Sequence, residues 1–421
     1  MKKILIASTA LVAAGLMTTG TASASEKIKL QLGGFSKWWV VAKWNDSDWQ
    51  KGSNTYNGAL AAVGSNLNNV DVIGDNEIHF VGSTTLDNGM KVGVQVELEA
   101  GGHSDMSQDT IDASFAFVEG GFGKLIIGTH NNGTYLLHVM APDAAGNWGE
   151  GGLLQSGVAV AQPTNVMGMP YLNPAQNVAS SAKNGATTAI ASDNKAEKIT
   201  YVAPALNMGA FGTIIAGASY VPNLVEDNRY PIANSTEAMG AGMLYTNTIA
   251  GVGVKTSAGY VTYGADAGAG TPATSVAGVG RTHEMSFGTQ LSYAGFTIGG
   301  SYRHVNTDRQ IEQSNMGVDQ GTSSVGTAWD AGIQYANGPY AVSFAYFHSQ
   351  VLGNIGYGAN DGQDVINIYQ VSAKYTLGPG VDLLGSVGYA SFDDETQKQT
   401  AGGDSNHNEG WAIMTGLSLA F

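Results

Sequence analysis

Hydrophobic and polar side chains alternate with a period of two in many short segments after residue 26. In residues 91–99, Val92, Val94, Val96 and Leu98 alternate with Lys91, Gln95, Glu97 and Glu99. Successive side chains of a strand point to opposite faces, so the pattern predicts strands with one apolar and one polar face. The segments are about ten residues long, which is the length that a tilted strand needs to cross a bilayer.

Sixteen such strands are predicted. Their ranges are 27–45, 76–86, 89–100, 109–120, 122–130, 196–205, 208–221, 238–250, 252–264, 280–294, 296–308, 325–337, 339–351, 363–377, 380–392 and 408–421. Short connections such as Asp87-Asn88-Gly89 alternate with long polar ones, the longest of which runs from 131 to 195. Short turns on one side and long loops on the other are typical of an outer-membrane barrel.

The predicted fold is therefore all-β, a 16-stranded antiparallel transmembrane β-barrel formed by residues 25–421 as one domain. The last strand must pair with the first, because an open sheet edge is not tolerated in lipid. Phe421 ends that strand, and we expect it at the closure of the barrel and at the bilayer boundary, where aromatic rings are favoured.

The composition narrows the choice between this barrel and a secreted β-protein such as a propeller, a sandwich or a lectin. Charged residues make up 13% of the chain, against a usual value of about 25%, while hydrophobic residues make up 43%. Few charges suit strands whose outer face meets lipid. The net charge of −15 argues against nucleic acid as a partner, and the absence of cysteine excludes disulfides and thiol catalysis.

The N-terminus has the pattern of a secretory signal peptide. Lys2 and Lys3 precede an apolar segment, and Ala22-Ser23-Ala24 fits a cleavage site. We expect residues 1–24 to be removed, and a retained helical anchor is the alternative. The remaining chain has no run of 18 apolar residues.

Several motifs resemble the general porins of Gram-negative bacteria, especially those of the alphaproteobacterial type. They are NEIHFVGSTTLDNGMKVGVQVELEA, FAFVEGGFGKLIIGTHN, KITYVAPAL and the terminal aromatic residue. The resemblance implies a homotrimer whose third loop folds into the lumen and narrows it. It also implies that acidic residues of this loop face basic residues of the barrel wall.

The long connection 131–195 holds the candidates for that constriction. Asp143 and Glu150 are the acidic residues in its first part. The second part, 152–195, has the composition of an exposed flap. Loops this long without secondary structure are usually functional.

Alternate residues of a strand share one face, and this strand parity predicts which charged residues line the lumen. The basic candidates are Lys27, Lys29, Lys91, Lys198, Arg303 and Lys374, of which Arg303 and Lys374 lie deep in clearly alternating strands. The acidic candidates are Glu97, Glu99, Asp112, Glu284, Asp330 and Asp382. For each residue the alternative is a solvated, paired wall charge. The 34 acidic residues outnumber the 19 lysines and arginines, so we expect a mild preference for cations.

The functional prediction is a water-filled diffusion channel of the outer membrane for small hydrophilic solutes and ions. Two alternatives remain open: a sugar- or peptide-specific channel with Trp39, Trp148 and Phe347 as lumen aromatics, and a structural or adhesive barrel. No hydrolase or nucleotide-binding motif is present, so we predict no enzymatic activity and no cofactor. The acidic outer loops could bind Ca²⁺ weakly and contact lipopolysaccharide.

Overall fold

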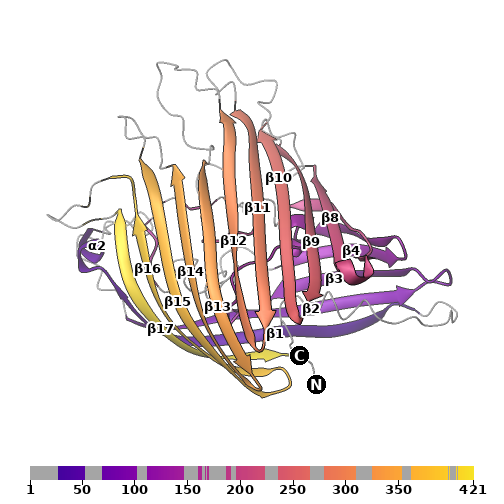
Figure 1. The fold of residues 1–421 in the computed structure, drawn as a ribbon, viewed down its shortest axis with the longest axis horizontal. Coiled ribbons are helices and arrows are strands. Elements are labelled where there is room, and N and C mark those ends of the chain that lie inside the picture. Colours follow the sequence, from indigo (N-terminus) through magenta and orange to yellow (C-terminus); the bar gives the residue numbers. More distant parts are fainter. Residues whose placement is uncertain are drawn as a thin grey trace.

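The computed structural model describes residues 27–52, 69–101, 111–146, 160–163, 166, 168–169, 186–190, 196–222, 236–265, 279–309, 325–352, 362–396, 398, 404 and 406–421. These residues form a single antiparallel sheet that closes on itself (Figure 1). The predicted signal peptide, residues 1–24, lies outside the described residues.

The strands follow one another around the wall in chain order. They are β1 (Lys29–Asn45), β2 (Val70–Thr85), β3 (Lys91–Glu99), β4 (Ile111–Gly120), β5 (Gly123–Thr129), β6 (Glu197–Val202), β7 (Leu206–Asn207), β8 (Thr213–Val221), β9 (Thr236–Ile249), β10 (Val252–Ala265), β11 (Val279–Tyr293), β12 (Phe296–Arg309), β13 (Gly326–Asn337), β14 (Tyr340–Leu352), β15 (Gln363–Gly378), β16 (Val381–Asp393) and β17 (His407–Ala420). Because β6 and β7 both pair with β8, they fill one interrupted position. The wall thus has sixteen strands, which confirms the predicted count.

The barrel closes where β1 pairs with β17, with Phe35 opposite Ala420 and Asn45 opposite Gly410. Phe421 continues this ladder. Its N–H donates to the carbonyl of Gly34 at 3.1 Å, and its own carbonyl accepts from the Gly34 N–H at 3.0 Å. Phe421 is therefore hydrogen-bonded into the first strand, and the residue is 67% exposed.

Short turns gather at the end of the barrel where β1 begins and β17 ends (Figure 1). Two of these turns have a non-glycine residue with positive φ, Ala250 at 50° and Ala294 at 51°, each followed by a glycine that also has positive φ. Two successive positive φ values give the tight turn whose twist matches that of the flanking strands. We call this the turn end of the barrel and the opposite one the loop end.

Three local features differ from the sequence-based expectation. Strand β2 begins at Val70, six residues earlier than predicted, and a short helix, α2 (Ser47–Gly52), follows β1. In β4 the register shifts between Ile111 and Ala113. The alternation of residues 111–117 therefore changes face, and Phe115 and Phe117 are buried inside the barrel while Ser114 is exposed.

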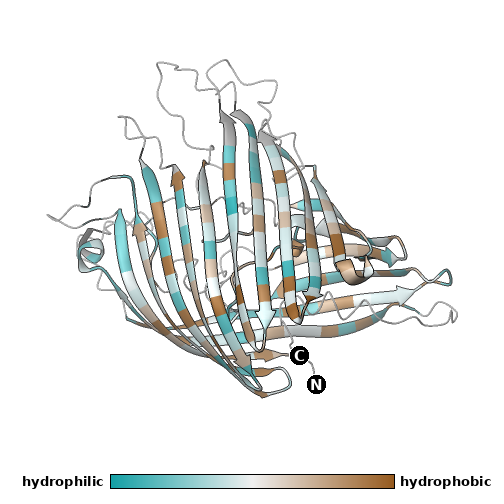
Figure 2. Ribbon diagram, viewed as in Figure 1, coloured by the Kyte–Doolittle hydropathy of each residue, from teal (hydrophilic) through white to brown (hydrophobic). Residues whose placement is uncertain are grey.

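The outer face carries the large exposed apolar side chains. On β17 these are Trp411, Ile413 and Leu417, while the alternate residues Ala412 and Met414 are buried. Figure 2 shows hydrophobic and hydrophilic residues alternating along the front strands. Among the described residues, no helix has both the length and the apolar character that crossing a membrane requires.

Candidate functional site: the lumen and its inner loop

The connection after β5 turns into the barrel and lies along its inner wall. It begins with the short helix α3 (Gly133–Leu136), which is capped by the side chain of Asn132. Asn132 is fully buried, and its amide donates to the carbonyl of Ile190 at 3.0 Å. The predicted inward fold of this loop is thus present in the described residues 130–146.

Three serines of the wall hold the loop backbone. The loop N–H groups of Gly133, Val139 and Ala144 each donate to a serine hydroxyl, at 2.8, 2.9 and 2.8 Å. The acceptors are Ser219 on β8, Ser257 on β10 and Ser343 on β14. Buried backbone N–H groups need such partners, so the serines stabilise an irregular segment inside the barrel.

Glycines of the wall give the loop room to lie flat. A Cβ atom on Gly242 would lie 2.8 Å from the Cα of Thr134, and a Cβ atom on Gly288 would lie 1.8 Å from the carbonyl oxygen of Val139. No side chain fits at such distances. Strands β9 and β11 therefore carry glycine where the loop backbone touches the wall.

The second part of the connection also packs inside the barrel where it is described. Val160, Met169 and Ile190 are fully buried. Val160 and Met169 belong to an apolar cluster that includes the inward residues Phe347, Ile366 and Phe392. The expectation of an exposed flap over 152–195 is wrong for these residues, because apolar side chains of β13–β17 face inward and the loop covers them.

Arg303 lies on the inner face, as parity predicted, but the loop covers it. Its Nε and Nη2 atoms donate to Oε2 of Glu284 at 2.8 and 2.5 Å, and Nη1 donates to the carbonyl of Ala189 at 2.8 Å. Both charged side chains are 0% exposed. In this arrangement Arg303 and Glu284 hold the loop and present no surface to an ion in the lumen.

Asp330 is buried in the same way. One carboxylate oxygen accepts from the Ala141 N–H at 3.1 Å and from the Ser301 hydroxyl at 2.7 Å, and the other accepts from Thr188 at 3.2 Å. This carboxylate ties both parts of the connection to β12 and β13.

Asp143 lies at the partly exposed edge of the loop. Its carboxylate accepts from Ser343 at 3.1 Å and from Gln370 at 3.4 Å, which fixes it against β14 and β15. The other acidic candidate of the loop, Glu150, lies outside the described residues.

The partly exposed acidic residues of the wall gather on β2, β3 and β4. Glu77 lies opposite Glu99, and His79 lies opposite Glu97. Asp112, at the register shift of β4, has a carboxylate oxygen within 4.8 Å of those of Glu77 and Glu99. The structure thus brings the predicted residues Glu97, Glu99 and Asp112 together with Glu77 and His79, which the sequence analysis did not single out.

Partly accessible basic residues of the inner wall lie on several strands, each beside a carboxylate or an aromatic ring. On β1, Lys37 and Lys43 pair with Asp75 and Asp71 at 3.2 and 3.1 Å. Lys374 is 3.9 Å from Asp382, and both side chains are about a quarter exposed. On β3 and β5, Lys91 and Lys124 place their ammonium groups 5.9 and 4.8 Å from the ring centre of Phe117. Because Asp75 and Glu77 are alternate residues of β2, the pair of Lys37 with Asp75 lies next to the acidic group on β2–β4.

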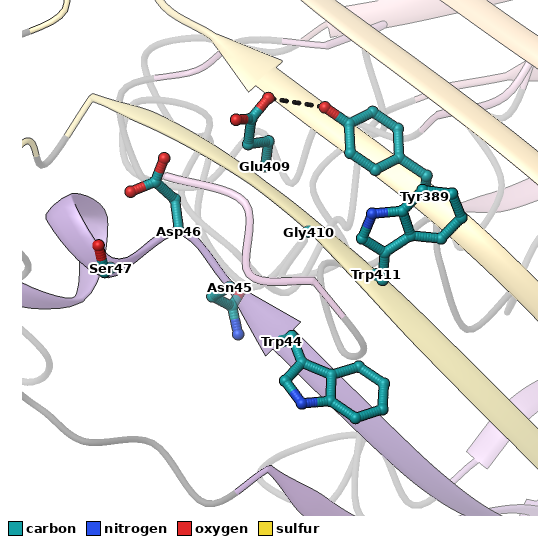
Figure 3. A pocket seen from close by; sticks show the side chains of 8 residues that line it. All are labelled: Trp44, Asn45, Asp46, Ser47, Tyr389, Glu409, Gly410 and Trp411. Carbon is teal, nitrogen blue, oxygen red and sulfur yellow. Dashed lines mark hydrogen bonds between the residues drawn. The ribbon is translucent and has the colours of Figure 1, made fainter.

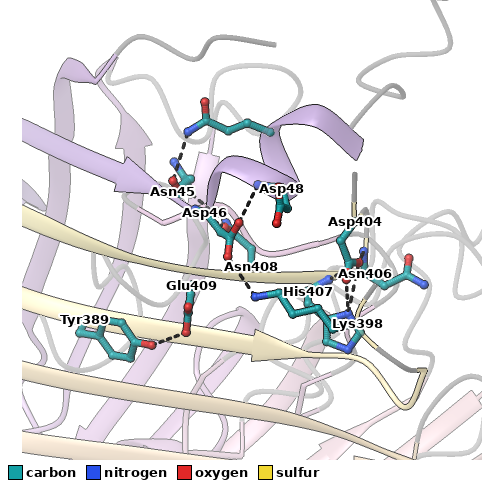
Figure 4. Close-up of polar contacts among 11 residues, drawn as sticks. Asn45, Asp46, Asp48, Tyr389, Lys398, Asp404, Asn406, His407, Asn408 and Glu409 are labelled. Atoms are coloured by element: carbon teal, nitrogen blue, oxygen red, sulfur yellow. Dashed lines mark hydrogen bonds and ion pairs between the residues drawn. The ribbon is translucent and has the colours of Figure 1, made fainter. Parts of the chain in front are cut away.

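The loop end of the closure carries a second polar cluster (Figure 4). Lys398 donates to Asp46 at 3.0 Å, and the Asp404 N–H donates to the carbonyl of Asp48 at 2.9 Å. Burial alone would raise the pKa of Asp46, but the hydrogen bonds from Lys398 and from the Asp48 N–H outweigh it and the pKa is lowered. The same carboxylate raises the pKa of Lys398.

Next to this cluster, the outer face has a pocket of about 290 Å³ (Figure 3). Trp44, Tyr389 and Trp411 line it, and the Tyr389 hydroxyl donates to Glu409 at 2.6 Å. Aromatic side chains at this height of the barrel suit the interface between lipid tails and headgroups.

Sequence reasoning missed the features that position the inner loop. Ser219, Ser257 and Gly288 lie on the inward face of their strands, which is the only signal that the alternation of the sequence offers for them. Serine and glycine occur both at wall positions that a loop covers and at wall positions that face water, so the residue types do not tell the two apart.

A closed sixteen-stranded barrel that is apolar outside and holds a loop in a polar lumen is the architecture of a membrane channel. The family of Gram-negative porins matches residues 7–395, so the chain belongs to that family. Its members are diffusion channels of the outer membrane, not enzymes, and solutes pass through their lumen.

Solved structures agree on the fold. An anion-selective porin from Comamonas acidovorans is 15% identical with a TM-score of 0.57, and the alignment covers 94% of this chain and all of that one. A loop-deletion mutant of OmpT, an outer membrane protein of Vibrio cholerae, is 12% identical with a TM-score of 0.51. That alignment covers 94% of this chain and 100% of the OmpT chain. Among curated protein sequences, none matches this chain.

Proposed function

We propose that this porin is a mildly cation-preferring diffusion channel whose inner loop, within residues 131–195, sets the width of the pore. The observation that carries the proposal is the group of four carboxylates, Glu77, Glu97, Glu99 and Asp112, on the accessible inner face of β2–β4. A walled cleft lined by one sign of charge concentrates counter-ions, so cations are enriched at this level.

The fate of Arg303 supports the same preference. Its charge is buried and paired with Glu284, so it adds no positive potential to the open lumen. The accessible lysines near the turn end have acidic neighbours, as Lys374 has Asp382. A dense basic row opposite the loop, which would favour anions, is not formed by the described inner-wall residues. The structurally similar porin from Comamonas acidovorans is called anion-selective, so the proposed preference rests on the wall charges of this chain and not on the fold.

The proposal includes a homotrimer in the outer membrane, in contact with lipid and lipopolysaccharide, and an alphaproteobacterial origin. The sequence motifs given above support the trimer and the origin, and the exposed apolar outer face supports lipid contact. The acidic residues of the loop end, such as Asp48, suit bridging by a divalent cation to anionic headgroups, including weakly bound Ca²⁺.

Two observations bear on the sugar- or peptide-specific alternative. Trp39 and Phe347 are 3% and 1% exposed, packed within the apolar cluster beneath the loop. They therefore offer no surface to a passing solute. Trp148 lies outside the described residues. A continuous aromatic path is thus not formed by the described residues.

Single-channel recording in a planar bilayer under a KCl gradient tests the proposal. We expect conductance steps in groups of three and a reversal potential on the cation side. Reversal on the anion side would contradict the selectivity, and single independent steps would contradict the trimer. Absence of conductance from correctly folded protein would favour a structural or adhesive barrel.

A further inference from the structure

We infer that Glu77, His79 and Glu97 form a binding site for a divalent transition-metal ion, such as Zn²⁺, on the inner wall of the channel. The inference rests on the proposed function only in that the site opens into the lumen. It adds a ligand, and with it a means of regulation, to the acidic group that we propose to enrich cations.

The three side chains converge because of the strand geometry. Glu77 and His79 are alternate residues of β2 and so share the inner face, and His79 lies directly opposite Glu97 on β3. One ligand atom from each residue lies within 4.8 Å of the other two. The side chains of His79 and Glu77 are 12% and 17% exposed, so the group is sheltered yet reachable from the lumen.

The contact between the imidazole and a carboxylate calls for a hydrogen atom or a metal ion between the two. Nε2 of His79 lies 2.7 Å from Oε2 of Glu77. A bare imidazole nitrogen and a carboxylate oxygen repel each other at this distance, because both are acceptors. Either a proton or a metal ion therefore lies between them. The acidic neighbours Glu97 and Glu99 favour any cation at this position.

The ligand types select the kind of metal. Imidazole nitrogen suits Zn²⁺, Cu²⁺ and Ni²⁺, whereas Ca²⁺ and Mg²⁺ are bound by oxygen atoms alone. One imidazole and two carboxylates supply three ligands, which leaves a coordination position for water from the lumen. A rigid sheet holds all three residues, so little chain ordering is needed on binding.

Neighbouring side chains orient two of the ligands. The Gln95 amide donates to Oε1 of Glu97 at 2.5 Å, and this contact holds the carboxylate in place on the inner face of β3. The ring of Phe35 packs edge-on against His79, with 6.2 Å between ring centres. Such supporting contacts typically change metal affinity by about 10- to 100-fold when they are removed.

Isothermal titration of the purified, untagged, folded protein with ZnCl₂ at neutral pH tests the site. We expect one Zn²⁺ per chain, bound more tightly than Mg²⁺. His79→Gln should abolish this binding, and Gln95→Ala should weaken it by roughly tenfold. Glu119→Gln is the matched control, because it removes an inner-wall carboxylate from β4 outside the site, and it should bind Zn²⁺ like the unmodified protein. Equal affinity for Zn²⁺ and Mg²⁺, or unchanged binding by His79→Gln, would overturn the inference.

A spectroscopic measurement on the unmodified protein tests the site without relying on the folding of a variant. The electron paramagnetic resonance spectrum of the unmodified protein with one equivalent of Cu²⁺ should show coupling to a single imidazole nitrogen. Coupling to no nitrogen, or to several, would overturn the site.

Conductance separates this inference from the proposed function. Added Zn²⁺ should reduce the single-channel conductance of the unmodified protein and not that of His79→Gln. A barrel that binds Zn²⁺ without conducting would refute the channel and retain the site. A cation-preferring channel that binds no Zn²⁺ would refute the site alone.

Discussion

Nη2 of Arg303 lies 2.5 Å from Oε2 of Glu284, and neither side chain has any surface exposed to solvent. The pair joins neighbouring strands, since Glu284 is on β11 and Arg303 on β12. Arg303 also reaches the loop, through the carbonyl of Ala189 at 2.8 Å. A single guanidinium thus binds one oxygen of a buried carboxylate of the wall and a buried carbonyl of the loop.

Removal of Arg303 should therefore destabilise both the wall and the loop. Arg303→Met keeps most of the volume but leaves Glu284 buried without its partner. Breaking one side of a buried pair typically costs about 3–5 kcal/mol. We expect a lower temperature of barrel unfolding, measured by the shift of heated samples on a gel, and noisier single-channel current as the loop loosens.

The double variant Arg303→Met with Glu284→Gln is the control for this prediction. Replacing both charges removes the uncompensated carboxylate, so a large part of the lost stability should return. If the single and double variants are equally unstable, the contact with the loop carbonyl, and not the buried charge, is the main contribution of Arg303.

Gly288, which has no side chain where the loop backbone contacts β11, allows a test of the loop position. A Cβ atom there would lie 1.8 Å from the Val139 carbonyl oxygen, so Gly288→Ala should displace the loop from β11 and change the single-channel conductance. Gly253→Ala is the matched control on the inner face of β10, where the nearest atoms are 3.6 Å away. It should leave conductance unchanged. Equal behaviour of the two variants would contradict the packing of the loop against β11.

The wall of the barrel could be predicted from the sequence because each strand is indicated by the alternation of its own residues. Alternation fixed the sixteen strands, and strand parity placed Arg303, Glu284 and Asp330 on the inner face. The exception is β4, where a one-residue register shift turns Phe115 and Phe117 inward. Such a shift moves every later side chain of the strand to the opposite face, and no residue type in the sequence indicates where it occurs.

The inside of the lumen could not be predicted in the same way. Whether Arg303 faces ions or lies under a loop depends on the path of a segment more than a hundred residues away in the sequence. Composition suggested an exposed flap for 152–195, but Val160 and Ile190 pack inside the barrel. Small wall residues such as Ser257 make that path possible, but the sequence alone does not show which small residues of the inner wall contact the loop.

The acidic group on the wall should determine the ion preference. Glu97→Gln with Glu99→Gln removes two negative charges from the accessible face of β3, so the reversal potential under a KCl gradient should move toward the anion side. The control is Glu409→Gln, which removes a carboxylate from the outer face of β17. It should leave the reversal potential unchanged. An equal shift in both would mean that the total charge of the protein, and not the lumen wall, determines selectivity.

The ion pair between Asp46 and Lys398 at the loop end should make a pH-dependent contribution to stability. The ordinary pKa values are 3.8 for the carboxyl and 10.5 for the ammonium group, and in the folded protein the first is lowered and the second raised. The contribution of Asp46 is therefore present above pH 3.8 and is lost as the pH falls through its lowered pKa. The contribution of Lys398 is present below pH 10.5 and is lost as the pH rises through its raised pKa.

A comparison of Lys398→Met with the unmodified protein measures this contribution. Lys398 is 44% exposed, and such pairs typically contribute less than about 1 kcal/mol. We expect a small difference in unfolding temperature that is constant near neutral pH, shrinks in strong salt and vanishes once the pH exceeds the raised pKa of Lys398. A difference that persists in strongly alkaline solution would show that the side chain stabilises the closure through packing of its methylene groups, and that the charge contributes little.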